Sequence, residues 1–158
     1  MAADGDLYHS DFFAWTQAQG RAIRGAASGG NAPIDWDNVA EEIESLGRTE
    51  RRELSSRIAT IIEHLLKLSC SPAAESRRGW MQTVRRTRGE VEDVLADSPS
   101  LRPEVPSLIV AATARAARRI ADDLDAAGEA TPEVLARLRA ITLTPDHVLG
   151  DWLPDRPG

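Results

Sequence analysis

The chain has 158 residues, of which 42% are hydrophobic but only 4% aromatic, so aliphatic and alanine side chains must form most of any core. Its 25 acidic residues outnumber its 19 basic ones, and the net charge of −6 argues against a general affinity for nucleic acids or anionic membranes. A chain of this length fits one domain, and we expect residues 1–158 to form a single one.

The single cysteine, Cys70, excludes an internal disulfide and fits a reducing compartment. The first six residues carry neither a basic run nor an apolar one, so no export signal is expected. No apolar stretch approaches the roughly 18 residues that a membrane-spanning helix needs. Together these features predict a cytoplasmic protein that does not enter the membrane.

The N-terminal third of the sequence predicts two helices separated by a glycine-containing segment. The first is expected over about residues 10–24, and the segment 25–30, with three glycines and a serine, is expected to end it. The second is expected over residues 36–46. Asp35 is a suitable N-cap for it, and Gly47, directly after the last apolar position, is a suitable C-cap.

The rest of the sequence predicts three long helices and two short ones. The long helices are expected over residues 49–70, 74–96 and 103–127, each with apolar side chains three and four positions apart. Short helices are expected after Thr131 and Thr144, both followed by proline. The side chains expected to face inward include Leu54, Ile58, Ile61, Ile62, Leu65, Leu68, Val84, Val91, Val105, Leu108, Ile109, Ala112, Ala116, Ile120 and Leu124. The expected fold is all-α, a helical bundle of four or five main helices with short C-terminal helices.

The stretch IDWDNVAEEIESLG, residues 34–47, concentrates five carboxylates on the expected second helix. On a helical wheel Glu41 points away from the apolar face, while Glu42 and Glu44 flank that face on opposite sides. The three glutamates therefore do not converge, and a capped amphipathic helix with solvated acids is the simpler interpretation. Glu42, on the same side as Asp35, is the carboxylate that merits a test.

His64 lies at the edge of the apolar face of the expected third helix. A half-buried histidine beside a carboxylate could act as a general base or as a metal ligand. A zinc or iron site needs three or four ligands, and neither the Glu-x-x-His nor the His-Glu-x-x-His pattern is present, so no metal or other cofactor is expected. A histidine that forms an ordinary hydrogen bond at the core boundary is the simpler interpretation.

Five arginines lie in the segment 77–88 of the expected fourth helix. Arg78 and Arg85 share its outer face and form a candidate basic patch for nucleic acid. Arg77 and Arg88 flank the core, where they are expected to pair with glutamates of adjacent helices. Because the arginines do not form one ridge and the protein is acidic, nucleic-acid binding is the less favoured interpretation.

Several segments together resemble a known family. These are YHSDFFAW at 8–15, the acidic stretch at 35–47, HLLK at 64–67, Trp80, and SPSL at 98–101, and they resemble the bacterial domain-of-unknown-function family twenty-nine. The resemblance extends from Tyr8 to about Trp152; it implies an all-α fold and no particular activity. The segment 143–149 departs from the family's pattern, which leaves any role of the tail open.

The positions that match this family include polar residues beyond what helix packing requires, chiefly Asp11, Glu42 and His64. A ligand-binding protein or an enzyme, with or without a divalent metal, would bring these three side chains together in one pocket, and this is one functional hypothesis. The favoured hypothesis is a protein-interaction module that binds an unknown protein partner or itself, because the chain is small, helical and has an alanine-lined helix over residues 103–127. Nucleic-acid binding through Arg78 and Arg85 is the third.

Overall fold

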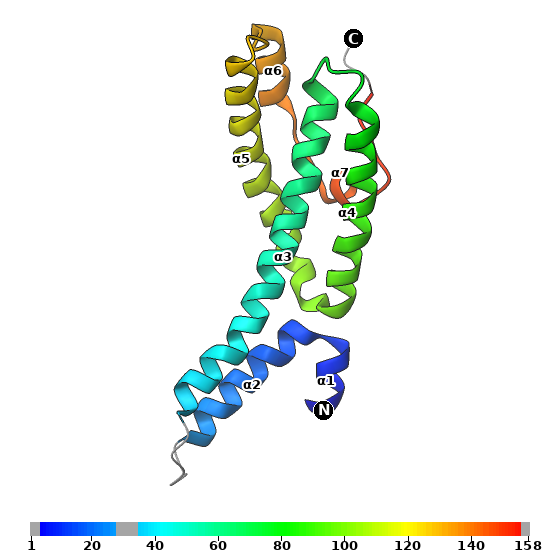
Figure 1. Cartoon of the computed structure of the whole chain (residues 1–158). Helices are drawn as coiled ribbons and strands as arrows, with labels where there is room; N and C mark the ends of the chain where they lie inside the picture. The colour runs from blue at the N-terminus through cyan, green and yellow to red at the C-terminus, as the bar shows by residue number, and fades with distance from the viewer. Residues whose placement is uncertain (1–3, 28–34, 156–158) are drawn as a thin grey trace. The chain divides into compact units, whose positions relative to one another are not determined.

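A computed structural model describes residues 4–27 and 35–155 of the chain, residues 4–6 by their backbone alone. Within these residues the regular structure is helical, without strands. The elements are α1 (Asp4–Ser10), α2 (Phe12–Ala26), α3 (Trp36–Cys70), α4 (Arg77–Asp97), the 3₁₀ helix η2 (Pro99–Glu104), α5 (Val105–Ala126), α6 (Pro132–Ala140) and α7 (Pro145–Leu149). The helices follow one another along the described chain as Figure 1 labels them, and the all-α prediction is confirmed.

Contacts divide the chain into two compact units. Unit 1 comprises Met1–Leu54 and Glu92–Pro103, and unit 2 comprises Ser55–Val91 and Glu104–Gly158. Helices α3 and α4 contribute residues to both, and each unit is described by itself below. The organisation of residues 1–158 as one domain stays a prediction.

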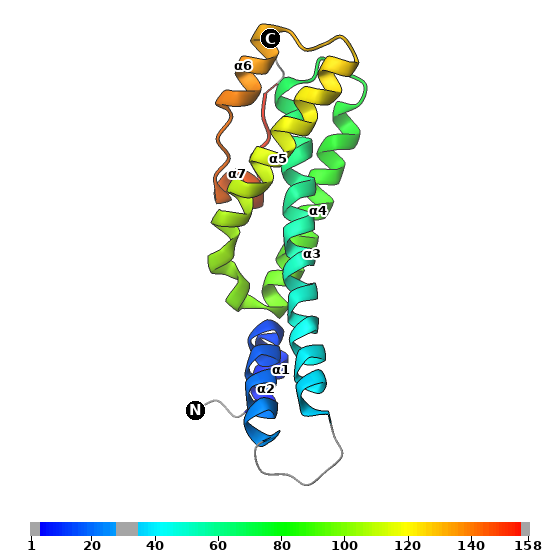
Figure 2. The ribbon, with the colours of Figure 1, turned by 90° about the vertical axis from the view of Figure 1, so that its left-hand side faces the viewer.

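In unit 1, α2 lies beside the N-terminal part of α3, as both ribbon views show (Figures 1 and 2). Helix α2 begins at Phe12 because the Asp11 side chain accepts a hydrogen bond from the backbone N–H of Ala14, 2.9 Å away. Residues 28–30 of the predicted stop lie outside the described residues, and Gly25 itself is helical.

Helix α3 is continuous from Trp36 to Cys70, so the predicted break at Gly47 is wrong. Gly47 is buried, and a Cβ placed on it would overlap Thr16 Oγ1 and lie 3.2 Å from Phe13 Cδ2, both on α2. The glycine therefore serves the close approach of α2 to α3 instead of ending a helix. The expected N-terminal cap is confirmed, since Asp35 Oδ1 accepts a hydrogen bond from the N–H of Asn38 at 3.2 Å.

The core of unit 2 is formed by the C-terminal part of α3 together with α4 and α5. The six residues of α3 between Leu54 and Leu68 that were predicted to face inward are all fully buried, and the first of them, Leu54, belongs to unit 1. Seven buried side chains of α5, from Val105 to Leu124, match the predicted ones one for one. Burying an aliphatic side chain of this size stabilises a fold by about 1.5–3 kcal/mol, so these stripes dominate the stability of the unit.

The C-terminal part of unit 2 turns back along the long helices, with α6 and α7 both in contact with α5 (Figures 1 and 2). Gly128 ends the preceding segment with a φ of 71°, a conformation that glycine adopts without strain. Thr131 and Thr144 cap α6 and α7, as the sequence predicted. No helix within the described residues is both long enough and apolar enough to cross a lipid bilayer.

Candidate functional site

Asp11 has a structural role in unit 1. Besides capping α2, its carboxylate accepts hydrogen bonds from the N–H of Ser100 at 2.7 Å and from the Ser100 hydroxyl at 2.8 Å. Ser98 makes a second link between the same segments, because its hydroxyl oxygen accepts from the N–H of Phe13 at 3.2 Å. Asp11 therefore links the start of α2 to the segment after α4, and these hydrogen bonds engage both oxygens of its carboxylate.

Glu42 and His64 are not brought together, which corrects the expectation of one pocket. Both lie on the continuous helix α3, 22 positions apart, and a rise of 1.5 Å per residue separates their backbones by about 33 Å. His64 is half-buried, and its Nδ1 lies 2.8 Å from the Thr60 carbonyl oxygen, which can only accept. Among the described residues, no group of three or more His, Cys, Asp or Glu side chains is placed to hold a metal ion.

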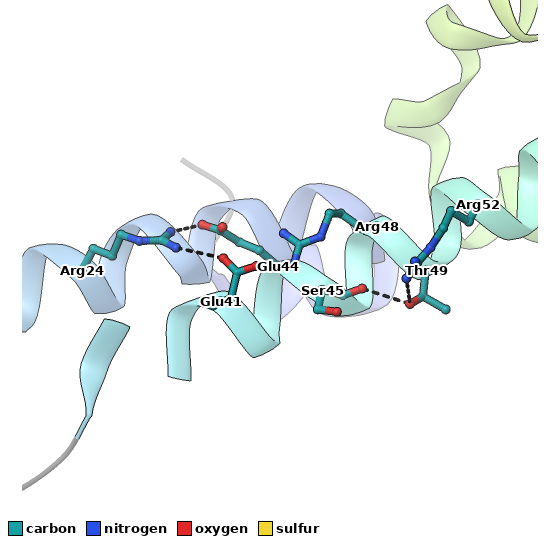
Figure 3. Close-up of polar contacts among 7 residues, drawn as sticks. All are labelled: Arg24, Glu41, Glu44, Ser45, Arg48, Thr49 and Arg52. Carbon is teal, nitrogen blue, oxygen red and sulfur yellow. Dashed lines mark hydrogen bonds and ion pairs between the residues drawn. The ribbon is translucent and has the colours of Figure 1, made fainter. Parts of the chain in front are cut away.

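Glu44, which the sequence placed on the far flank of its helix, has partners on α2 (Figure 3). Arg24 donates a hydrogen bond to Glu44 and lies 3.7 Å from Glu41, which also pairs with Arg48 at 2.5 Å. The hydrogen bond from Arg24 lowers the pKa of Glu44. A Cβ on Gly20 would lie 2.6 Å from Glu44 Cγ, so the missing side chain at Gly20 makes room for this carboxylate. The polar contacts continue along α3 through Ser45, Thr49 and Arg52.

The contacts of α2 with α3 thus depend on two glycines and one ion-paired glutamate, which sequence reasoning missed. The only sequence signal was the pair of glycines, Gly20 inside the first predicted helix and Gly47 directly after the second. Gly20 lies within the first predicted helix and received no role of its own, and Gly47 was interpreted as a helix C-cap. An isolated glycine inside a helix costs about 1 kcal/mol relative to alanine, but Gly89 of α4 has the same local pattern and an added Cβ there would meet nothing within 4 Å, so the sequence alone does not separate the packed glycines from the open ones.

The arginines of α4 divide into two groups. Arg78 and Arg85 are exposed, as predicted for the outer face. Arg77 and Arg88 bind backbone carbonyls of their own unit, and the expected pairing of these two with glutamates is wrong. Arg77 is buried and donates to the carbonyl of Leu68 at 2.6 Å. These two cations are therefore part of the fold and extend no basic patch.

Arg88 fixes the returning C-terminal segment. Its guanidinium donates to the carbonyls of Val148 at 2.9 Å, His147 at 2.8 Å and Trp152 at 2.6 Å. Burial lowers the pKa of Arg88, yet an arginine stays charged in proteins. The planar guanidinium has several N–H donors in a fixed arrangement, which suits three carbonyls supplied by the segment 147–152.

Three further ionisable groups have altered pKa values with identifiable causes. Burial raises the pKa of Glu50, and the nearby Glu53 and Asp97 raise it further. A hydrogen bond from Lys67 lowers the pKa of Glu63. Burial raises the pKa of the Cys70 thiol, so this cysteine is a core residue with little thiolate and not a nucleophile.

Unit 2 has an apolar groove of about 260 Å³. The lining residues are Val110, Thr113, Ala114 and Ala117 of α5 together with Leu138, Arg139 and residues 141–143. We call this the α5–α6 groove. Val110 is 70% exposed, more than any other large hydrophobic side chain of the described chain. The groove and the exposed Val110 beside it form one apolar surface that a partner could cover.

A smaller cavity of about 160 Å³ lies near the ends of α3 and α5, beside Trp80. Its wall carries charges of both signs, from Lys67 and Asp123, and Lys67 is already held by Glu63 at 2.6 Å. The α5–α6 groove, by contrast, has Arg139 as its one charged lining residue. We therefore take the α5–α6 groove as the candidate functional site.

Comparisons with known proteins agree on the fold. The family model described as Domain of unknown function DUF29 matches residues 7–148. An alpha-helical protein of unknown function from Rhodospirillum rubrum has a similar crystal structure, with a TM-score of 0.72 and 24% sequence identity over 91% of this chain and 89% of that one. A likeness at this identity shows the fold alone. Among curated proteins, none matches this chain.

Proposed function

The chain belongs to the family described as Domain of unknown function DUF29, and we propose that within this family it is a helical protein-interaction module whose partner binds in the α5–α6 groove. The observation that carries the proposal is the exposed Val110 at the edge of an apolar groove. Removing such apolar surface from water supplies the main driving force of most protein–protein association. We also propose a cytoplasmic location, which a buried, protonated Cys70 and the lack of any other cysteine support.

The groove favours a partner helix over an extended peptide. One wall is the side of α5 that carries Thr113, Ala114 and Ala117, and side chains this small allow another helix to approach closely. An amphipathic helix places apolar side chains at positions i, i+4 and i+7, which is the spacing that a groove along one helix accepts. Edge strands, which an extended peptide would need, are absent from the described residues.

Two neighbouring substitutions test the proposal. Val110→Asp places a charge at the groove, while Ala111→Asp places the same charge on an exposed position of α5 outside the lining. Both positions are exposed, so both variants are expected to fold. We expect Val110→Asp to lose a bound protein that the wild type and Ala111→Asp both retain. The partner is captured from a lysate of the source organism, identified by mass spectrometry, and its affinity is then measured with purified components.

The same pair of variants can overturn the proposal. If the wild type and both variants capture the same proteins with the same affinities, the groove is not the binding surface. The polar alternative, a ligand or metal site built from Asp11, Glu42 and His64, has no comparable support, since those residues do not meet. The nucleic-acid alternative has two exposed arginines, Arg78 and Arg85, in its favour, and unchanged mobility of DNA and RNA at low salt would remove it.

A further inference from the structure

An exposed apolar stripe lies on the N-terminal part of α3, in unit 1. Val39 is 40% exposed and Leu46 is 49% exposed, with the half-buried Ile43 between them. The steps of four and three residues place these side chains on one side of the helix. We call Val39, Ile43 and Leu46 the α3 stripe. Its spacing is the i, i+4, i+7 pattern with which a helix enters a groove.

The α3 stripe has an acidic flank. Glu42 lies next to it on the helix, is exposed, and makes no hydrogen bond or ion pair with the described residues. Unit 1 as a whole has 13 acidic residues against 6 basic ones, a net charge of −7. A surface that accepts this stripe should therefore be apolar in its middle and basic at its edge.

The α5–α6 groove of unit 2 has this complementary chemistry. Arg139 lines it, and Arg118 lies one turn beyond Ala114 on the same ridge of α5. Both arginines are exposed, and neither makes an ion pair or hydrogen bond within the part of the chain that the structure describes. Unit 2 has 13 basic residues against 12 acidic ones, a net charge of +1, so the protein's net negative charge arises in unit 1.

The two surfaces also match in length. Val110 and Ala117 are seven positions apart on α5, as are Val39 and Leu46 on α3, and seven residues of helix span about 10 Å. We propose that the occupant of the α5–α6 groove is a second copy of this chain, which inserts its α3 stripe and sets Glu42 beside Arg139. This inference rests on the proposed function, because it names the partner of the same groove.

The contact is heterologous, since the surface used by one copy differs from the surface used by the other. Each copy that docks its stripe still has a free groove, and each copy that fills its groove still has a free stripe. Association therefore continues beyond the dimer as the concentration rises, into closed rings or open chains. Pairing of two α3 stripes with each other is disfavoured, because it would bring two Glu42 carboxylates together.

Mixing two variants of the full chain tests the proposal. Leu46→Asp removes the stripe but leaves the groove, and Val110→Asp does the reverse. By light scattering during gel filtration, the wild type should form dimers and larger species, and each variant alone should weaken this by about tenfold or more. An equimolar mixture of the two variants should form a dimer that goes no further, because only one intact stripe and one intact groove remain. Ser56→Asp on α3 and Ala111→Asp on α5, both exposed, are the matched controls that should associate like the wild type.

A charge reversal provides an independent measurement. Glu42→Arg and Arg139→Glu should each weaken association, and a mixture of the two variants should associate more tightly than either variant alone. Circular dichroism melting establishes that every variant is folded, and Leu46→Ser with Val110→Ser replaces the aspartate pair if either aspartate variant unfolds. A wild type that stays monomeric at the highest concentration, or variants that fail to complement in the mixture, overturns the self-association. If Val110→Asp nevertheless loses a foreign protein partner that Ala111→Asp retains, the proposed function stands without self-association. If neither self-association nor binding of a foreign partner depends on Val110, both proposals are wrong.

Discussion

Replacing Gly47 by alanine has two opposing effects on stability: alanine favours the helix, but its side chain disturbs the packing of α2 on α3. In an open helix interior this change stabilises by about 1 kcal/mol. At Gly47 the added Cβ would overlap Thr16 Oγ1 and lie 3.2 Å from both Gln17 Nε2 and Phe13 Cδ2. Thr16 is fully buried and its hydroxyl donates to the Phe13 carbonyl at 2.8 Å, so it cannot turn away without losing that bond. Overpacking of this kind costs about 1–3 kcal/mol, and we expect a net loss of up to about 2 kcal/mol.

Equilibrium unfolding in urea measures the difference against two glycines that face open space. A Cβ on Gly25 or on Gly89 would meet nothing within 4 Å, and both residues are exposed on their helices. Gly89→Ala should therefore raise the free energy of unfolding by about 1 kcal/mol, and Gly25→Ala, in the last turn of α2, by less. Gly47→Ala should move it in the opposite direction with an unchanged dependence on urea concentration.

A double-mutant cycle identifies the cause. Thr16→Ala removes the oxygen that the new Cβ would overlap, so Gly47→Ala should cost less in that background, with an interaction energy of about 1 kcal/mol or more. Two results would refute the close-packing interpretation. One is a Gly47→Ala protein as stable as the Gly89→Ala protein; the other is strict additivity of Thr16→Ala and Gly47→Ala.

Three other substitutions test charged groups. Arg88→Lys cannot reach three carbonyls at once, and we expect a loss of about 1.5–3 kcal/mol together with faster amide hydrogen exchange over residues 147–152. Burial raises the pKa of Glu50, so ionisation of Glu50 destabilises the fold at pH values above the ordinary glutamate pKa. Glu50→Gln should therefore be more stable than the wild type at neutral pH and equally stable in strong acid. Urea unfolding at a series of pH values measures this difference. The opposite holds for Glu63, because the hydrogen bond from Lys67 lowers its pKa. Ionised Glu63 stabilises the fold above the ordinary glutamate pKa, and this stabilisation is lost as the pH falls through the lowered pKa. Glu63→Gln should remove that acid-side loss and be less stable than the wild type at neutral pH, and an unchanged pH profile would contradict the assigned ion pair.

The sequence predicted the features that depend on periodicity within one helix. The buried residues predicted for α3, from Leu54 to Leu68, and for α5, from Val105 to Leu124, are confirmed, because apolar side chains three or four positions apart lie on one face of a helix and that face is the one buried. The caps at Asp35, Thr131 and Thr144 followed for a similar reason, since a side-chain oxygen bonds to a backbone N–H three positions on.

The features that depend on contacts between helices could not be obtained in this way. A glycine after an apolar run has the same local pattern whether it ends a helix or admits a neighbouring one, and only the contact of Gly47 with Thr16 on another helix distinguishes the two. The same applies to the glutamates. The wheel placed Glu42 and Glu44 on opposite flanks and favoured Glu42 because it shares a side with Asp35, but the ion pair with Arg24 of α2 is made by Glu44. Glu42, without a partner in the described chain and beside exposed Val39 and Leu46, has the position expected of a residue that meets its cation on another molecule. The charge reversal at Glu42 and Arg139 therefore tests the same carboxylate that the sequence singled out, in an intermolecular role that the sequence alone did not suggest.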